Sequence, residues 1–300
     1  MRRYFLILLV GTLAFEGKSQ VSEIGLCGGV SFYMGDLNPN GVFMGSRPAG
    51  GLIYRYNINP RFAFKANALF GSLQASDAKT GTPERNLSFR SPLSELSAQM
   101  ELNFLKLYND KGKRFFSPYV FLGLGIFSFN PQAEINGHWY DLQPLGTEGQ
   151  DLNSVYEDPI TGAKVKYDQK RYSLTNVAIP FGLGIRFNFL QYYCIGFEWG
   201  FRKTFTNYID DVGGTYVDNE FLKDRRSELI ANLADRTTAV DAIGATDYNK
   251  WGTMRATNTK TTDWYSFALL SFTFKLNYFK DCLSNAANPS YNKAKKAKRR

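Results

Sequence analysis

The residues best suited to chemistry are few and do not form a complete catalytic motif. The sequence has one histidine, His138, with Glu134 and Asp141 close by. Barrel hydrolases and acyltransferases use a histidine with a serine or an acid as base and nucleophile. A single histidine beside Trp139 and Tyr140 is more typical of an exposed loop. We therefore expect no catalytic residue.

Two other patterns could bind a cofactor or a metal. Asp210 and Asp211 with Asp218 offer carboxylate oxygens for calcium, but they lack a regular ligand spacing, so a solvated loop is expected. "GLGIFSFN" (Gly123–Asn130) and "GLGIRFNF" (Gly182–Phe189) contain Gly-x-Gly without a complete dinucleotide fingerprint before a helix. Such glycines more often admit large neighbours to a sheet or bend it. We expect no cofactor and no metal.

The beginning of the chain resembles an export signal. "MRRYFLILLVGTLAFEGKS" carries Arg2 and Arg3 before an apolar run, and Gly17 and Ser19 have the spacing of a cleavage site. The run is too short for a spanning helix, which needs about 18 residues. No small residue precedes Cys27 as a lipoprotein signal requires. Residues 1–19 are therefore interpreted as a signal peptide.

The rest of the chain alternates apolar and polar residues with a period of two. In "LSAQMELNF" the apolar residues from Leu96 to Phe104 alternate with Ser97, Gln99, Glu101 and Asn103. This period places the two sets on opposite faces of a strand. Similar segments recur along the chain at 24–34, 51–57, 62–70, 119–129, 175–189, 194–205 and 264–278. The pattern predicts about eight strands.

Strand length and connection length favour a membrane barrel over a soluble sandwich. The strands have about nine to twelve residues, which suits a tilted crossing of a bilayer. Short turns near 58–60, 107–114 and 190–192 alternate with long loops at 36–49, 72–91, 130–172 and 207–263. This alternation on an even number of strands is typical of outer-membrane barrels. We predict an all-β fold, an eight-stranded antiparallel transmembrane β-barrel over residues 20–280 with long extracellular loops.

The predicted barrel has an apolar face toward lipid and a polar face toward its interior. A barrel of eight strands is wide enough only for side chains. Charges on the inner face must pair, because an unpaired buried charge is costly. We expect ion pairs within the barrel and no pore. The candidate interior charges are Arg55, Lys65, Glu101, Glu198 and Arg202.

One long loop is predicted to contain a helix. "NEFLKDRRSELIANLADR" places Phe221, Leu222, Leu229, Ile230 and Leu233 at helical spacing. Asp218 or Asn219 can cap its start. We expect one surface helix over about 220–236, outside the barrel wall.

The three cysteines leave two possibilities open. Cys194 begins the seventh strand and Cys282 follows the eighth, so both are expected near the periplasmic rim. A Cys194–Cys282 disulfide is possible in an oxidising periplasm if the Cα atoms come within about 7 Å. Separate thiols are the alternative. Cys27 is expected to face the interior.

The strongest composition bias lies in the tail, residues 281–300. The net charge is +9, and six basic residues lie in the last eight positions: Lys293, Lys295, Lys296, Lys298, Arg299 and Arg300. An exported protein does not readily meet nucleic acid, so we expect no such partner. The tail is interpreted either as solvated or as the contact for an acidic periplasmic partner.

Several segments resemble the PorG-like outer-membrane component of the type IX secretion and gliding machinery of Bacteroidota. They are "YMGDLNP" (Tyr33–Pro39), "PYVFLGLGIFSFNPQA" (Pro118–Ala133), "YDLQPLGTEGQ" (Tyr140–Gln150), "IPFGLGIRF" (Ile179–Phe187) and "GFRKTFTNYIDDVGGTY" (Gly200–Tyr216). Similar proteins tend to carry aspartate where this chain has Asn207.

The resemblance implies a location in the cell outer membrane, with loops outside and both termini in the periplasm. It also implies a non-enzymatic role, in which the barrel contacts outer-membrane lipid and docks a periplasmic ring of a lipoprotein and its partner. The alternatives are a passive small barrel, acting as an adhesin or membrane stabiliser, and a membrane-embedded enzyme.

Overall fold

The computed structural model describes eight long strands that form one barrel. It describes residues 21–276 except residues 40, 80–82, 84, 106–115, 160, 190–191, 238–250 and 257–260. The barrel strands are β1 (Val21–Met34), β2 (Arg47–Asn57), β3 (Phe62–Ser76), β4 (Ser88–Asn103), β5 (Phe116–Phe129), β10 (Thr175–Phe189), β11 (Tyr193–Thr204) and β12 (Trp264–Lys275).

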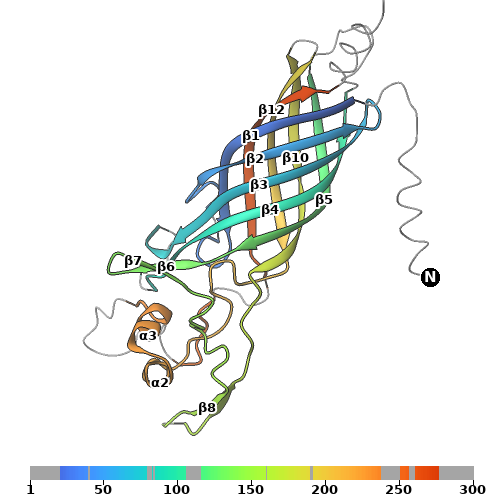
Figure 1. Ribbon diagram of the computed structural model, residues 1–300. Coiled ribbons are helices and arrows are strands. Elements are labelled where there is room, and N and C mark those ends of the chain that lie inside the picture. The colour runs from blue at the N-terminus through green and yellow to red at the C-terminus, as the bar shows by residue number, and fades with distance from the viewer. Residues whose placement is uncertain are drawn as a thin grey trace, which may run out of the picture.

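The sheet closes on itself. Its order is β3-β2-β1-β12-β11-β10-β5-β4, and β3 also pairs with β4. Each pair is antiparallel, and the first and last strands meet in register from Glu23↔Lys275 to Met34↔Trp264. The predicted fold class, an eight-stranded antiparallel β-barrel, is confirmed (Figure 1).

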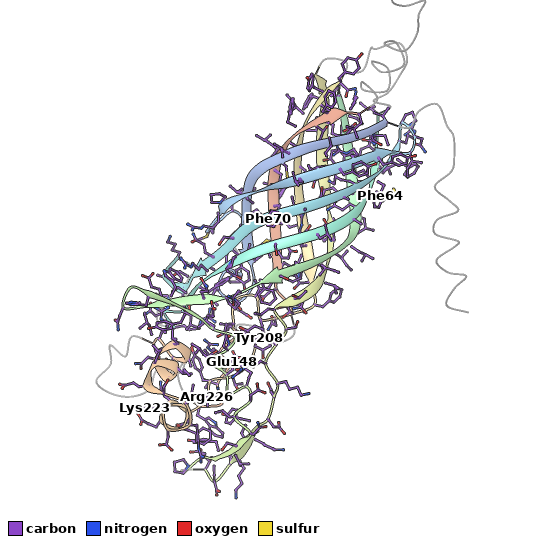
Figure 2. The ribbon with its side chains drawn as sticks, in the orientation of Figure 1. Phe64, Phe70, Glu148, Tyr208, Lys223 and Arg226 are labelled. Carbon is purple, nitrogen blue, oxygen red and sulfur yellow. The ribbon has the colours of Figure 1, made fainter. Side chains whose placement is uncertain are left out.

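The wall alternates between exposed apolar and buried side chains. On β4, Leu96 is 66% exposed, whereas its neighbour Ser97 is buried. Phe64 and Phe70 lie on the outer face of β3 (Figure 2). Exposed large apolar residues occur on all eight strands, from Leu26 on β1 to Phe272 on β12. A band of this kind suits lipid, because a protein surface in water rarely exposes so much contiguous apolar area.

The long loops gather at one end of the barrel, the lower end in Figure 1. They contain the short elements η1 (Asp77–Lys79), β6 (Gln132–Ile135), β7 (His138–Asp141), β8 (Ser154–Glu157) and β9 (Lys164–Tyr167). The second loop is shorter than expected. Strands β3 and β4 remain paired as far as Ser76↔Ser88, so the predicted loop at 72–91 reduces to residues 77–87.

The predicted single helix is wrong in one respect. The segment forms two short helices, α2 (Asn219–Arg225) and α3 (Glu228–Ala234). Asp218 caps α2 through Phe221 N, as expected, but Ser227 then caps α3 through Ile230 N. Ser227 has an extended backbone because it is the N-cap of α3, and this non-helical residue separates the two helices.

The described part of the chain contains no helix long and apolar enough to cross a bilayer.

Large side chains fill the barrel interior where the wall carries glycine. A Cβ on Gly184 would lie 2.4 Å from Tyr119 Cζ, and one on Gly200 would lie 2.5 Å from Phe121 Cζ. These close approaches explain the glycine-rich strands, because any side chain there would displace a buried ring. Nearer the loops, the interior is an apolar cluster that includes Phe127 and Phe267.

Candidate functional site

The five predicted interior charges all lie buried inside the barrel. Arg55 Nε lies 2.9 Å from Glu101 Oε2, and Lys65 Nζ lies 3.2 Å from Glu101 Oε1. Lys65 also pairs with Glu198. Arg202 does not join these four, since its partner is Glu95 at 3.0 Å.

Three further charges complete this network, and the sequence interpretation missed them. Glu23 accepts from Arg55 Nη1 at 3.0 Å, Arg186 lies 3.6 Å from Glu101, and Glu95 pairs with Arg202. Each lies at an inward-facing position of its strand, where the alternation of apolar and polar residues places a polar side chain. That alternation was the signal that could have identified them. The eight charges balance, with Glu23, Glu95, Glu101 and Glu198 opposite Arg55, Lys65, Arg186 and Arg202.

This network fills the lumen rather than lining a channel. Arg55, Arg186, Arg202 and Lys65 are among the largest fully buried side chains. The hydroxyl of Tyr119 donates to Glu198 at 2.8 Å. Buried charges held by several partners at once cannot readily exchange them for a passing solute. The interior therefore acts as a structural cross-brace between strands.

At the loop end, segments far apart in sequence form what we call the loop cap, residues 35–39, 77–79, 83, 85–87, 142–152 and 205–217 with 251–256 and 261–263. Arg255 is its centre. Its Nη1 donates to the Asp211 carbonyl at 2.6 Å and to Thr147 Oγ1 and Glu148 Oε1 at 3.2 Å each. Thr147 Oγ1 donates to Asp211 Oδ2 at 2.5 Å. These bonds join two of the segments that carry the family resemblance, Tyr140–Gln150 and Gly200–Tyr216.

A third segment that carries the resemblance, Tyr33–Pro39, contacts Asp210, the residue before Asp211. Tyr33 Oη lies 2.6 Å from Asp210 Oδ2 and 2.8 Å from Asp263 Oδ1. Asp36, Asp210 and Asp263 are buried, and their carboxylate oxygens lie within 4.8 Å of one another. A single hydroxyl proton cannot serve two carboxylates, so a proton on one carboxyl group completes this arrangement.

The expectation of a solvated aspartate loop is therefore wrong. Asp210 and Asp211 are buried, while Asp218 is separate from them as the cap of α2. Sequence spacing could not find the trio, because Asp36 lies in the loop after β1, 174 residues before Asp210, and Asp263 lies 53 residues after Asp210 at the far end of its loop. Carboxylate oxygens of this kind suit a hard cation, but they equally suit a shared proton.

Burial governs the electrostatics of the loop cap. It raises the pKa of the Glu148 and Asp211 carboxyl groups, although the Arg255 guanidinium opposes the shift. Burial raises the pKa of Asp263 to about 8. Burial and then the charges of Asp263 and Asp36 raise the pKa of Asp210 well above its usual range. These shifts agree with the proton that the Tyr33 geometry requires on one carboxyl group.

The remaining candidate residues lie apart from both clusters. His138 is exposed at the turn end of the β6–β7 hairpin, with Nδ1 3.2 Å from the Asn136 carbonyl. Cys27 and Cys194 are buried thiols on the inner face. Cys282 lies outside the described residues, so the Cys194–Cys282 pair stays a prediction. The predicted signal peptide and the six basic residues of the tail also lie outside them.

Comparison with known proteins gives a partial family match and remote structural similarity. A family model described as "Domain of unknown function (DUF6089)" matches residues 2–143, less than half of the chain. No curated protein sequence matches. Among solved structures, Neisserial surface protein A is similar at 8% identity and a TM-score of 0.37, over 86% of this chain and 97% of that one.

Two further solved structures are similar at the same level. One is the attachment invasion locus protein Ail of Yersinia pestis, at 9% identity and a TM-score of 0.34 over 86% of this chain and 97% of that one. The other is the N-terminal β-barrel domain of Pseudomonas aeruginosa OprF, at 8% identity and a TM-score of 0.32 over 86% and 100%.

Proposed function

We propose that this protein is a non-enzymatic, non-conducting barrel of the outer membrane that acts as a fixed anchor. The filled lumen is the observation that carries this proposal, since Arg55, Lys65 and Arg186 occupy the space that a channel would need. The exposed apolar band supports insertion into lipid. The loop cap covers the other end with bonded side chains. Such a molecule is built to hold a position in the membrane.

Purified protein in planar bilayers tests this part of the proposal. An anchor should insert, show heat-modifiable migration on a gel and give no stepwise conductance. Discrete channel openings that vanish after Lys65→Glu, a change in the lumen, would contradict it. A matched change on the loop surface, Lys164→Glu, should affect neither insertion nor conductance, because Lys164 is exposed.

The finer proposal is that the anchor serves a protein secretion and gliding machine by docking a periplasmic ring complex. It rests on the resemblance to PorG-like proteins. Three segments that carry this resemblance, 33–39, 140–150 and 200–216, form contacts with one another in the loop cap. On this proposal the loops face outward, and the barrel end with the short turns faces the periplasm together with both chain ends. The basic tail then meets an acidic surface of the ring.

Co-purification after mild detergent extraction tests the docking proposal. A machine component should bring stoichiometric periplasmic partners. A variant should have glutamine in place of the six basic residues between Lys293 and Arg300. We expect its barrel to insert normally and its capture of periplasmic partners to weaken at low salt. Equal capture by both forms at every salt concentration would remove the tail from the docking surface.

A passive adhesin is the second candidate, because the loop half of the molecule extends well beyond the barrel (Figure 1). Its outermost part carries an aromatic cluster of Tyr156, Phe221 and Trp251, with ring centroids 5.1 Å apart in two pairs. A protein that extracts alone, yet attaches cells to a surface through these loops, would favour this candidate over docking.

A further inference from the structure

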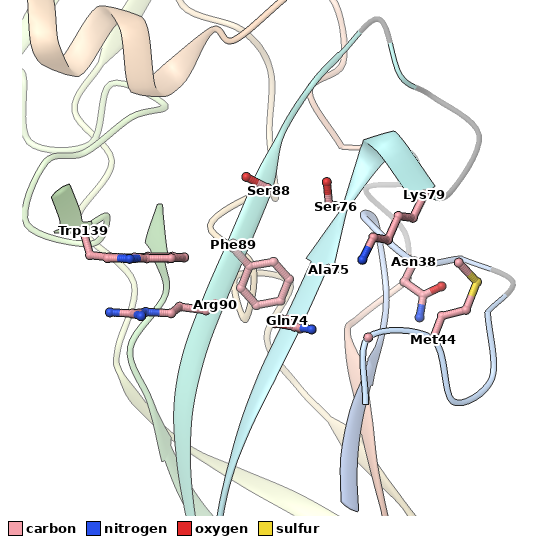
Figure 3. Close-up of a pocket in the computed structure, with 11 residues that line it drawn as sticks. Asn38, Met44, Gln74, Ala75, Ser76, Lys79, Ser88, Phe89, Arg90 and Trp139 are labelled. Atoms are coloured by element: carbon pink, nitrogen blue, oxygen red, sulfur yellow. The ribbon is translucent and has the colours of Figure 1, made fainter. Parts of the chain in front are cut away.

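A pocket with cationic, polar and apolar lining residues lies on the outer wall where β3 and β4 approach the loop end. It has a volume of about 170 Å³ and lies between the loop after β1 and the β6–β7 hairpin (Figure 3). One water occupies about 30 Å³ in the liquid, so there is room for a head group. The polar residues that line it include Gln74, Ser76, Lys79, Ser88 and Arg90, with Trp139 on one side.

Arg90 is held in place without an ion pair. Its guanidinium lies flat against the Trp139 ring, 3.6 Å from the centroid (Figure 3). Its Nε donates to Gln132 Oε1 at 3.0 Å. Within the described chain, none of the ion pairs with N···O up to 4.0 Å includes Arg90. A stacked guanidinium keeps its remaining N–H groups available in the plane, where they match a phosphate or carboxylate.

A second and a third cation adjoin the pocket. Lys79 is exposed on the opposite side from Trp139. Arg236 donates through Nη1 to Ser88 Oγ at 2.9 Å and through Nη2 to the Glu134 carbonyl at 3.0 Å. The Glu134 carboxylate is the acidic group that acts on Arg236. Asp141 is also near, since it accepts from Gln132 Nε2 at 2.7 Å. Three cations beside these two acids leave a net positive charge, which favours an anion.

Below the pocket, toward the apolar band, the wall carries a shallow, open hollow whose lining includes three glycines as well as Arg47 and Phe70. Gly28 and Gly50 are paired across β1 and β2, and Gly50 pairs with the exposed Phe70 on β3. A Cβ on Gly28 would meet no atom within 4 Å. Phe70 and Ser72 line this hollow, and Gln74 continues the same outward face of β3 into the pocket.

The pocket therefore lies at the height of lipid head groups. Gln74 on β3 pairs with Arg90 on β4, and Gln74 lies four residues along β3 from Phe70. At about 3.3 Å per residue this is about 13 Å along the strand, or about 10 Å along the membrane normal for a strand tilted by about 40°. Phe70 is the last exposed large apolar residue of β3 toward the loop end, so we take it as the edge of the apolar band, where a bilayer's head-group layer begins.

We propose that this surface binds a phosphorylated glycolipid of the outer leaflet. Arg90 and Lys79 would hold the phosphorylated head group, while an acyl chain lies in the glycine hollow at Gly28 and Gly50. A cationic pocket and an apolar hollow lie on the same outward face of β3. A ligand that contacts both must be an amphiphile rather than a free anion. The inference rests on the proposed outer-membrane location, and it adds a specific lipid contact to that role.

Native mass spectrometry of the full chain in mild detergent tests this site. The probes are diphosphorylated lipid A, its dephosphorylated form and inorganic phosphate. We expect one or two lipid A molecules to bind, and binding to weaken about fivefold to tenfold on dephosphorylation or in Arg90→Gln and Lys79→Gln, as for loss of a charge-assisted hydrogen bond. Lys203→Gln is the matched control, because Lys203 also lies over a tryptophan, 4.8 Å from the Trp264 centroid, but outside the pocket.

Equal lipid A binding by wild type, R90Q and K79Q would overturn the inference, as would equal loss in K203Q. Displacement of lipid A by millimolar inorganic phosphate would also overturn it, because the site would then select a free anion. Heat-modifiability on the same samples separates the two proposals: a chain that does not insert contradicts the anchor, whereas an inserted chain without lipid selectivity contradicts only this site. If R90Q does not fold, the exposed K79Q decides.

Discussion

Replacing Glu101 by glutamine should destabilise the barrel more than any exposed charge change. Three cations surround its carboxylate, with Arg55 at 2.9 Å, Lys65 at 3.2 Å and Arg186 at 3.6 Å. The amide keeps the shape, so no cavity forms, but the cations lose the charge that offsets their burial. Removing one partner of a buried ion pair costs about 3–5 kcal/mol. We expect about 3 kcal/mol for E101Q, the low end, because the amide oxygen still accepts a hydrogen bond.

Urea unfolding of the protein in lipid vesicles, followed by heat-modifiability and tryptophan fluorescence, measures this loss. The matched control is Glu157→Gln, whose pair with Lys164 at 2.9 Å is more than half exposed on both sides. An exposed pair contributes about 1 kcal/mol or less. If E101Q and E157Q lower the free energy of unfolding by the same amount, the lumen network does not brace the barrel and the reasoning fails.

Two further outcomes follow from the glycine contacts and from the loop cap. Gly184→Ala should cost about 1–3 kcal/mol, because its Cβ would meet the buried Tyr119 ring, whereas Gly28→Ala on the open outer wall should be nearly neutral. Comparing the two urea midpoints checks this, and equal midpoints would contradict it. The folded pKa of Asp263 is raised from 3.8 to about 8, so its contribution is complete below about pH 4 and is lost as pH rises toward 8. The thermal midpoint of the loops, followed by near-ultraviolet circular dichroism, should fall over that range and level off above it. Asp263→Asn should make the thermal midpoint nearly independent of pH over this range. If the thermal midpoint of that variant still falls with pH as in the wild type, another group causes the pH dependence.

The inward and outward faces of the barrel strands could be predicted from the sequence. A period of two is a local property, so Leu96 and Phe70 could be placed outside, and Glu101 and Lys65 inside, without knowing any partner. The turn near 58–60 and the positions of the long loops also follow from local composition, although the loop predicted at 72–91 is shorter. The turns predicted near 107–114 and 190–192 lie largely outside the described residues. The cap of α2 at Asp218 is local too, since a capping side chain bonds a backbone N–H only a few residues away.

The contacts between residues distant in sequence are visible only in the folded molecule. The alternation identifies the interior charges but not their partners. Arg202 on β11 pairs with Glu95 on β4, a strand that is not adjacent to β11 in the sheet, because closure and tilt bring the two side chains together across the lumen. The loops have no periodic pattern, so nothing local indicates that Asp36 and Asp210 are buried together near Tyr33. Their contacts depend on the folding of four loops over one rim. The pairing of Arg90 with Trp139 likewise depends on where a hairpin lies against the wall, which is a long-range property that no single segment encodes.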